Sequence, residues 1–412
     1  MAHRKAVTKE MAKRYAKASN PEKGRILDEL CALTGWTRRH ARRAIGLAIA
    51  PPPPTGKRRG RPPVYREDVL GPLRRVWATL DGPTGKRLAP FLPEIVEAME
   101  RAGELELTLE LRRKLLRISA ATIDRVLAPE RRRLQLKGRS GTKPGSILKA
   151  QIPIRTFADW DEARPGFFEA DLVGHDGGDL RGVFCQTLTL TDVSSGWTEV
   201  RALKNKAHRW VLEALAALER ELPIPVLGFD SDNGGEFVNT DLFAWVTARG
   251  VTFTRGRPYR KNDGCFVEQK NGAVVRQAVG YLRYDTDAEL AVLARLYDRL
   301  RPYVNFFQPQ MHLVEKHRQG AKVHRRYDRA QTPHQRLMAS PYVSPETKAS
   351  LQASYLSLNP VALKRDIARL QDRLLDLARL KEERRRKEVR TSPDHPWRTF
   401  VVRQRPRASR TS

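Results

Sequence analysis

Three carboxylate residues in the middle of the chain stand where their side chains could hold a metal ion together. Asp171 lies between apolar neighbours in an expected strand, and Asp232 begins the turn sequence Asp-Asn-Gly-Gly, which presents a side chain at a strand's end. Glu268 follows Asp232 after 35 intervening residues, in the first turn of an expected helix. Each residue alone has an ordinary structural explanation, because a strand Asp can bond a nearby amide and Asp-Asn-Gly is a common turn. Their order and spacing together favour a metal site.

Carboxylates in this number suit metal-dependent phosphoryl transfer. Mg²⁺ prefers hard oxygen ligands and retains waters, so one or two carboxylates suffice for each ion. Two ions ~3.5–4 Å apart activate a water or a hydroxyl and stabilise the leaving oxygen of an in-line displacement. The expected cofactor is therefore a pair of Mg²⁺ ions, with Mn²⁺ as an alternative.

Asp230 competes with Asp232 for the second position. The two residues are two apart, so on a regular strand both would face the same side. Asp232 adjoins the Asn-Gly turn and gives the 35-residue gap, and we therefore favour it as the ligand. We expect Asp230 to make a hydrogen bond that supports the turn or a ligand. His175, Asp176 and Asp179 lie in a Gly-rich turn, which we interpret as a loop.

The segments that carry these carboxylates alternate between strand and helix patterns. Expected strands cover residues 167–173, 183–190, 197–202, 226–229 and 251–254, and expected helices cover residues 206–222, 240–249 and 265–281. This order is typical of an α/β ribonuclease-H-like core, with a mixed five-stranded sheet and helices on both faces.

The middle of the chain resembles the catalytic core of bacterial insertion-sequence DDE transposases and retroviral integrases. The matching features are the strand Asp171, the Asp232 turn, the helix Glu268 after its 35-residue gap, and Asn271 three positions later. The resemblance covers about residues 165–285, and the segments 305–309 and 327–333 are similar to the tail of insertion-sequence transposases. The His-His-Cys-Cys zinc domain of retroviral integrases is absent.

This resemblance implies a DNA transposase. Asp171, Asp232 and Glu268 would be its catalytic and metal-binding residues. The enzyme would bind terminal inverted repeats, cleave the 3′ ends of the element and join them to target DNA, with no covalent protein intermediate. It would act as a homo-oligomer on double-stranded DNA. Two alternatives remain open: a catalytically silent DNA-binding regulator, and a ribonuclease-H-like nuclease that does not join DNA.

The charge distribution supports a nucleic-acid partner. Residues 1–150 carry 34 Lys and Arg against 15 Asp and Glu, and residues 301–412 carry 25 against 10. Residues 151–300 carry 18 against 22, and the whole chain has a net charge of +30. Basic flanks around a slightly acidic centre indicate DNA binding outside a carboxylate-rich core.

Two helix-turn-helix candidates lie in the N-terminal flank, at residues 20–49 and 109–127. An ordinary basic helical hairpin is the alternative for the first. Residues 57–63 resemble an AT-hook, which binds a narrow minor groove, although a plain basic linker fits equally. A loop before Glu268 could hold DNA phosphates. The expected DNA contacts in these segments are Arg38, Arg39, Arg42, Arg43, Arg59, Arg61, Arg257, Arg260 and Lys261.

A heptad seam marks the C-terminal helix. Its residues, Leu363, Ile367, Leu370, Leu374 and Leu377, alternate spacings of four and three. This pattern predicts either a dimer contact or a helix folded back on its own domain.

The sequence thus predicts a multidomain chain with helical N- and C-terminal regions around the α/β core. The expected divisions are a helix-turn-helix domain (1–50), a Pro/Arg-rich linker (51–65), a second helical DNA-binding domain (66–133), a linker (134–160), the catalytic core (161–300), a basic region (301–358), a coiled-coil-like helix (359–390) and a basic tail (391–412).

Other classes of protein are disfavoured. The three cysteines are isolated, which argues against a disulfide scaffold and a zinc finger and fits a reducing cytoplasm. We therefore expect a cytoplasmic bacterial protein that lies on the nucleoid when it is bound to DNA. No apolar run approaches the ~20 residues of a membrane span, so no membrane partner is expected. There is no complete Walker A motif.

Overall fold

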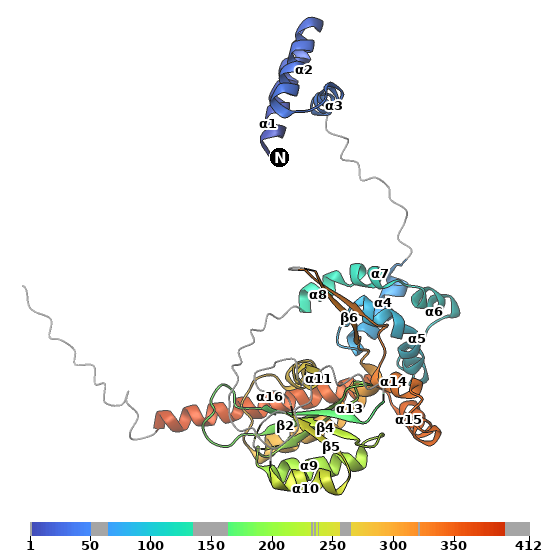
Figure 1. Ribbon diagram of the computed structural model, residues 1–412, viewed down its shortest axis with the longest axis vertical. Helices are drawn as coiled ribbons and strands as arrows, with labels where there is room; N and C mark the ends of the chain where they lie inside the picture. Colours follow the sequence, from blue (N-terminus) through green and yellow to red (C-terminus); the bar gives the residue numbers. More distant parts are fainter. Residues whose placement is uncertain are drawn as a thin grey trace, which may run out of the picture. The chain divides into compact units, whose positions relative to one another are not determined.

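The computed structural model describes residues 2–50, 65–134, 164–231, 234, 236–237, 239–255, 265–319 and 322–391. The chain divides into two compact units, Met1–Val64 and Tyr65–Ser412 (Figure 1). Each unit has its own apolar core. Among the described residues, no helix combines the length and the apolar character that crossing a membrane requires.

The described residues of the N-terminal unit, 2–50, form the helices α1 (Ala2–Lys17), α2 (Asn20–Thr34) and α3 (Arg38–Ile49). Gly35 ends α2 in the left-handed conformation with φ of 70°, which glycine adopts without a steric penalty. Thr37 then caps α3 by accepting a hydrogen bond from the backbone N–H of His40. The two helices and the turn expected in residues 20–49 are therefore confirmed. Helix α1 was not predicted, because its charged residues form no clear apolar stripe.

The larger unit begins with five helices whose apolar faces form its first layer. They are α4 (Glu67–Thr79), α5 (Gly85–Arg101), α6 (Leu109–Leu116), α7 (Ala120–Val126) and α8 (Ala128–Leu134). A Cβ on Gly85 would lie 2.0 Å from the carbonyl oxygen of Ala120, so the start of α5 approaches α7 too closely for any other residue. The helical reading of residues 66–133 is confirmed, whereas most of the linker expected at 134–160 lies outside the described residues.

A mixed five-stranded sheet forms the centre of this unit. Its strands are β1 (Phe167–Gly174), β2 (Gln186–Asp192), β3 (Thr198–Leu203), β4 (Gly228–Ser231) and β5 (Thr252–Arg255), in the order β3-β2-β1-β4-β5. Strand β2 is antiparallel to β1 and β3, while β4 is parallel to β1 and β5. The five expected strands are thus present in the expected mixed arrangement, and β1 is central.

Helices cover both sides of the sheet (Figure 1). The helices after β3, β4 and β5 are α9 (His208–Glu221), α10 (Thr240–Ala248) and α11 (Cys265–Lys270), and α11 continues into a π-helical segment, η2 (Asn271–Arg276), and α12 (Gln277–Val279). Figure 1 shows α9 and α10 on one side of the sheet and α11 on the other. The single helix expected at 265–281 is therefore interrupted by a π-helical stretch, a feature that occurs frequently at functional sites.

The remaining elements complete the unit. They are α13 (Asp287–Phe307), the hairpin strands β6 (Leu313–Gln319) and β7 (Lys322–Tyr327), α14 (Pro333–Ala339), α15 (Pro345–Ser357) and α16 (Pro360–Thr391). The hairpin was not predicted, since residues 301–358 were expected only to be basic.

The heptad residues of α16 are used inside the chain. Leu363, Ile367, Leu370 and Leu374 are buried in the core of the larger unit, where α16 packs along α13. Lys381 extends the contact, because its Nζ donates to Asp285 at 2.9 Å and to the buried Glu289 at 2.7 Å. Of the two alternatives for the seam, the structure shows the helix folded back on its own domain.

Candidate metal-dependent active site

Asp171 lies on the central strand of the sheet, next to the end of its parallel neighbour. It pairs with Thr189 of β2 on one side of β1. On the other side, Ala170 pairs with Ser231, the last residue of β4. Asp232 follows Ser231 directly along the chain but lies outside the described residues. The sheet therefore brings Asp171 to the edge at which β4 ends.

Asn271 connects Asp171 to the segment that carries Glu268. Its side-chain Nδ2 donates to Asp171 Oδ2 at 2.6 Å, and the backbone N–H of Leu172 donates to the other carboxylate oxygen at 2.7 Å. Glu268 lies in the first turn of α11, three residues before Asn271, and its side chain is exposed. Residues three apart on a helix share a face, so Glu268 and Asn271 approach β1 from the same side.

The oxygen atoms at this point suit Mg²⁺. Asn271 Oδ1 is buried and has no hydrogen-bond partner among the residues that the structure describes, although a buried amide oxygen normally has one. This oxygen belongs to the same side chain that holds Asp171, and the nearest acidic residue on the helix is Glu268. Carboxylate and amide oxygens are the ligands that Mg²⁺ accepts.

Within the described ranges, no three His, Cys, Asp or Glu side chains are placed to hold a metal ion by themselves. The donor types at Asp171, Glu268 and Asn271 fit the ion, and the position expected to complete the set, Asp232, is not among the described residues.

Glu169 is a fourth carboxylate that the sequence analysis did not single out. It lies two residues before Asp171 on β1, and its Oε2 accepts the backbone N–H groups of Phe266 and Val267 at 2.9 Å each. Glu169 therefore caps the first turn of α11 from the strand. Burial raises the pKa of Glu169 to about 8; the two backbone donors oppose this shift, and the charges of Asp230 and Glu268 add to it. The sequence did contain a signal for Glu169, because a residue two positions before Asp171 on a strand lies on the same face as Asp171.

Asp230 is buried on β4 and makes a supporting hydrogen bond. Its Oδ1 accepts from the hydroxyl of Thr254 at 2.6 Å, across the parallel pair β4–β5. This bond joins two neighbouring strands; the first residues of the turn that Asp230 was expected to support, Asp232 and Asn233, lie outside the described residues. Because Glu169 pairs with Asp230 in the β1–β4 register, the two acids and Asp171 lie on adjacent strands at one edge.

Lys270, two residues after Glu268, connects α11 to the chain segment that follows α13. Its side chain is buried and its Nζ donates to Gln310 Oε1, beyond the end of α13. Burial lowers the pKa of Lys270 to about 7, and the nearby charges of Arg87 and Arg336 lower it further. This contact ties the Glu268 helix to the base of the β6–β7 hairpin.

His175 lies outside the strands, as expected, in the connection between β1 and β2. His175 is fully buried after β1, and its Nε2 lies 2.7 Å from the hydroxyl of Thr187 on β2. Burial lowers the pKa of His175 to about 3, so the ring is neutral and structural at physiological pH. Asp176 and Asp179 do lie in the turn, where Asp179 pairs with Arg181 at 2.9 Å.

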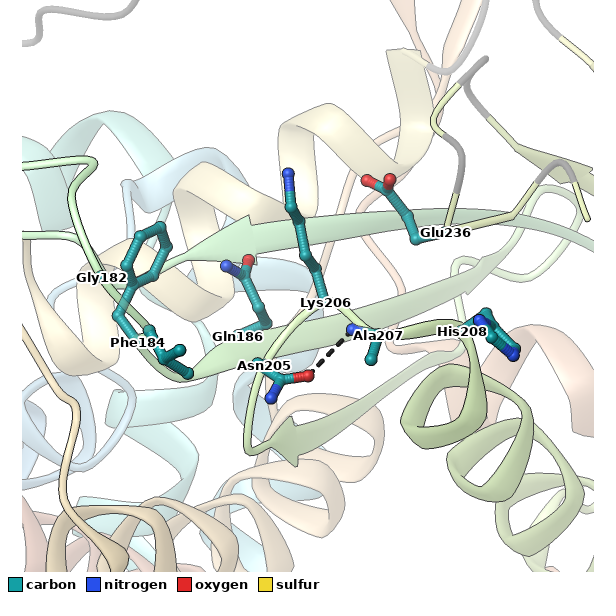
Figure 2. A pocket seen from close by; sticks show the side chains of 9 residues that line it. Gly182, Phe184, Gln186, Asn205, Lys206, Ala207, His208 and Glu236 are labelled. Carbon is teal, nitrogen blue, oxygen red and sulfur yellow. Dashed lines mark hydrogen bonds between the residues drawn. The ribbon is translucent and has the colours of Figure 1, made fainter.

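A surface pocket of about 590 Å³ adjoins this edge of the sheet. Figure 2 shows Gln186 from β2, Lys206 from the β3–α9 connection, His208 from the start of α9, and Glu236 around it. In the β3–α9 connection, the backbone N–H of Ala207 donates to Asn205 Oδ1 at 2.9 Å. The sequence analysis did not identify these residues. Lys206 is exposed and lines the pocket together with Glu236, which is 30 positions later in the sequence.

The expected DNA contacts are described only in part. Arg39, Arg42 and Arg43 are exposed on α3, opposite the buried Ala41 that faces the core of the N-terminal unit. Arg38 forms an ion pair with Asp28 of α2. The others lie outside the described residues: Arg59, Arg61, Arg257, Arg260 and Lys261.

The chain matches no protein-family model. Uncharacterized protein y4rM of Sinorhizobium fredii (strain NBRC 101917 / NGR234) is 40% identical to it over 329 residues, which are 79% of this chain and 93% of that protein.

Solved structures similar to the chain include retroviral integrase cores. The catalytic core domain of HTLV-2 integrase in complex with magnesium, in its dimeric form, is 17% identical, with a TM-score of 0.28, and covers 35% of this chain and 90% of that one. The catalytic core domain of BIV integrase is 16% identical, with a TM-score of 0.26, and covers 35% of this chain and 85% of that one.

Proposed function

We propose that this chain, which belongs to the same family as uncharacterized protein y4rM of Sinorhizobium fredii, is a DNA transposase of the DDE class. It binds the inverted repeats at the ends of a mobile element, cleaves their 3′ ends and joins them to target DNA. One observation carries the proposal: the Asn271–Asp171 hydrogen bond joins the Glu268 segment to the central strand at the edge where Asp232 follows β4. This hydrogen bond thus involves Asp171, the first carboxylate of the sequence motif, and the helical segment that carries Glu268, the third.

Each residue of the site has a distinct role in this proposal. Asp171, Asp232 and Glu268 hold two Mg²⁺ ions, which when bound activate the attacking oxygen and stabilise the leaving oxygen. Asn271 orients the Asp171 carboxylate through its amide. Glu169 fixes the first turn of α11 and thereby the position from which Glu268 extends.

DNA binding is assigned to the N-terminal unit. Helix α3 presents Arg39, Arg42 and Arg43 on its exposed side and follows α2 after a short turn, which fits the second helix of a helix-turn-helix. Two element ends must be held together for joining, so we infer that the protein acts as a homo-oligomer on DNA.

A strand-transfer assay tests the proposal. The substrate is a duplex that carries the inverted repeats flanking the gene, pre-nicked at the 3′ end to isolate the joining step. We expect Mg²⁺-dependent joining by the wild-type protein and none by Asp171→Asn or Glu268→Gln, with end binding intact in both. Glu213→Gln, on the exposed face of α9, is the matched control and should join normally.

Each alternative has its own result in this assay. Binding without any Mg²⁺-dependent chemistry would identify a silent regulator. Cleavage without joining would identify a nuclease.

A further inference from the structure

The β6–β7 hairpin is a strongly basic two-stranded ribbon. Residues 313–327 contain five Lys and Arg residues and a single acidic one, Glu315. Figure 1 shows the hairpin projecting away from the five-stranded sheet. In the described part of the ribbon, His317, His324, Arg325 and Arg326 are all exposed.

The register of the ribbon places like charges opposite each other. Lys316 pairs with Arg325, and like charges directly opposite destabilise an antiparallel pair. Arg318 occupies a position on the same face, because it stands two residues from Lys316, whereas Glu315 and Arg326 pair on the other face. The Glu315–Arg326 ion pair measures 2.9 Å, but Arg325 makes no ion pair with any described residue. One face of the ribbon is therefore cationic and lacks an internal counter-charge at Arg325.

The base of the ribbon is fixed beside the candidate active site. The backbone N–H of Asp328 donates to the carbonyl of His312 at 3.0 Å, and the Asp328 carboxylate pairs with Arg336 of α14 at 2.7 Å. Gln310 bridges to the returning chain just before the ribbon, and its side chain accepts from Lys270 of α11. The ribbon thus starts three residues after Gln310, the residue that is bonded to the Glu268 helix.

We propose that the β6–β7 hairpin is a DNA-binding ribbon that holds the phosphate backbone of a duplex next to the active site. This inference takes duplex DNA as the ligand because the proposed function is that of a DNA transposase, and in this respect it rests on the proposed function. A two-stranded β-ribbon fits the major groove of B-DNA. Strands of this length extend about 20 Å, which is enough to pass several phosphates. Phosphates also supply a negative counter-charge for Arg325, which is exposed and forms no ion pair with a described acidic residue.

Two double variants of the full-length protein test the ribbon. Lys316→Gln with Arg325→Gln removes both charges of the cationic pair. Glu315→Gln with Arg326→Gln removes the ion pair on the other face and leaves the net charge unchanged. Duplex binding is measured against salt concentration without Mg²⁺. We expect the first variant to lower the salt slope by about 1–2 and the affinity about tenfold, since each lost phosphate contact lowers the slope by about 0.9. The second variant should match the wild type.

A cross-linking experiment identifies the contact directly. A photoreactive benzoylphenylalanine is placed at Val323 on β7, which pairs with Arg318 on the cationic face, or, as a control, at the exposed Tyr342 between α14 and α15. Cross-linking to duplex from position 323, and not from position 342, supports the ribbon. The proposal is overturned by a wild-type salt slope in the Lys316/Arg325 variant. Equally, binding to phosphatidylserine vesicles that depends on these two residues, with unchanged duplex binding, would assign the ribbon to a membrane surface.

The results also separate this proposal from the one on which it rests. A variant that keeps the wild-type salt slope while the wild-type protein joins DNA rejects the ribbon alone. A ribbon that cross-links to duplex while the wild-type protein shows no Mg²⁺-dependent chemistry rejects the transposase assignment alone.

Discussion

The side-chain amide of Asn271 donates to the Asp171 carboxylate at 2.6 Å, and the two residues are 100 positions apart in the chain. Asp171 belongs to the central strand, whereas Asn271 is the first residue of the π-helical segment η2. The π-helical turn of η2 therefore begins at Asn271, the residue whose side chain contacts β1. The amide oxygen of Asn271 is buried and has no hydrogen-bond partner among the described residues.

Asn271→Ala should therefore lower DNA joining by about 10- to 100-fold, with the larger effect at low Mg²⁺, because it removes the group that orients a metal ligand. The joining rate as a function of Mg²⁺ concentration measures this change. Gln269→Ala, at an exposed position of the same helix, is the control and should leave the Mg²⁺ dependence unchanged. An equal loss at all Mg²⁺ concentrations would contradict a role in metal binding.

The two aspartates at the end of β4 should behave differently. Asp232→Asn should abolish joining on a pre-nicked end and leave end binding intact, because the amide keeps the volume of the ligand but not its charge. Asp230→Asn should retain measurable Mg²⁺-dependent joining, since an amide oxygen can still accept the hydrogen bond from Thr254. If Asp230→Asn is inactive and Asp232→Asn joins DNA, the second ligand has been assigned to the wrong residue.

The sheet could be predicted from the sequence because strands and helices alternate clearly there. The start of β2 was placed three residues early, at Val183, where an apolar residue extended the pattern. In the structure Val183 is 61% exposed, and the ladder begins at Gln186, opposite Gly174. Apolar character alone could not distinguish a strand residue from a loop residue, such as Val183, whose carbonyl accepts a hydrogen bond from the Arg283 side chain at 3.4 Å.

The role of Glu169 and the packing partner of the α16 leucines could not be predicted from the local sequence. The partners of Glu169 are the backbone N–H groups of a helix that starts almost one hundred residues later, so only the tertiary fold makes its role visible. The leucines of α16 would suit a coiled coil or an intramolecular face equally. Helix α13 settles this choice, since its N-terminal Glu289 also bonds Lys381 of α16.

Glu169 should be required for activity through the position of Glu268. Glu169→Ala removes the acceptor of the Phe266 and Val267 N–H groups and should reduce joining by at least tenfold. Glu169→Gln keeps an acceptor oxygen and should restore most of this loss. The Mg²⁺ concentration for half-maximal joining should rise in the Ala variant and return in the Gln variant. If both variants lose activity equally, the negative charge of Glu169, and not its capping bonds, is what matters.

Glu94 provides a test of the helical layer in which pH changes stability. Burial raises its pKa to about 7; the hydrogen bond from Gln335 opposes this shift and the charge of Glu97 adds to it. The folded-state pKa lies above the unfolded value, so ionisation between pH 4.5 and 7 destabilises the folded protein. Glu94→Gln should therefore increase the free energy of unfolding at pH 8 by about 1–3 kcal/mol and raise the melting temperature accordingly. At pH 4 the substitution should change both quantities little. Glu106→Gln, at an exposed position, should show no such difference.

The last prediction concerns how the N-terminal unit distinguishes element ends from other DNA. Arg39 and Arg42 are exposed on α3, and side chains that reach base edges contribute about 1–3 kcal/mol each to discrimination. Arg39→Ala with Arg42→Ala should therefore reduce the preference for the inverted repeat over random duplex more than it reduces binding to random duplex. Arg14→Ala, on α1 and paired with Glu29 at 3.4 Å, is the control and should leave the preference unchanged. Competition binding with both duplexes at fixed salt measures the ratio. An equal loss on both duplexes would show that α3 contacts only phosphates, and sequence reading would then have to come from another part of the chain.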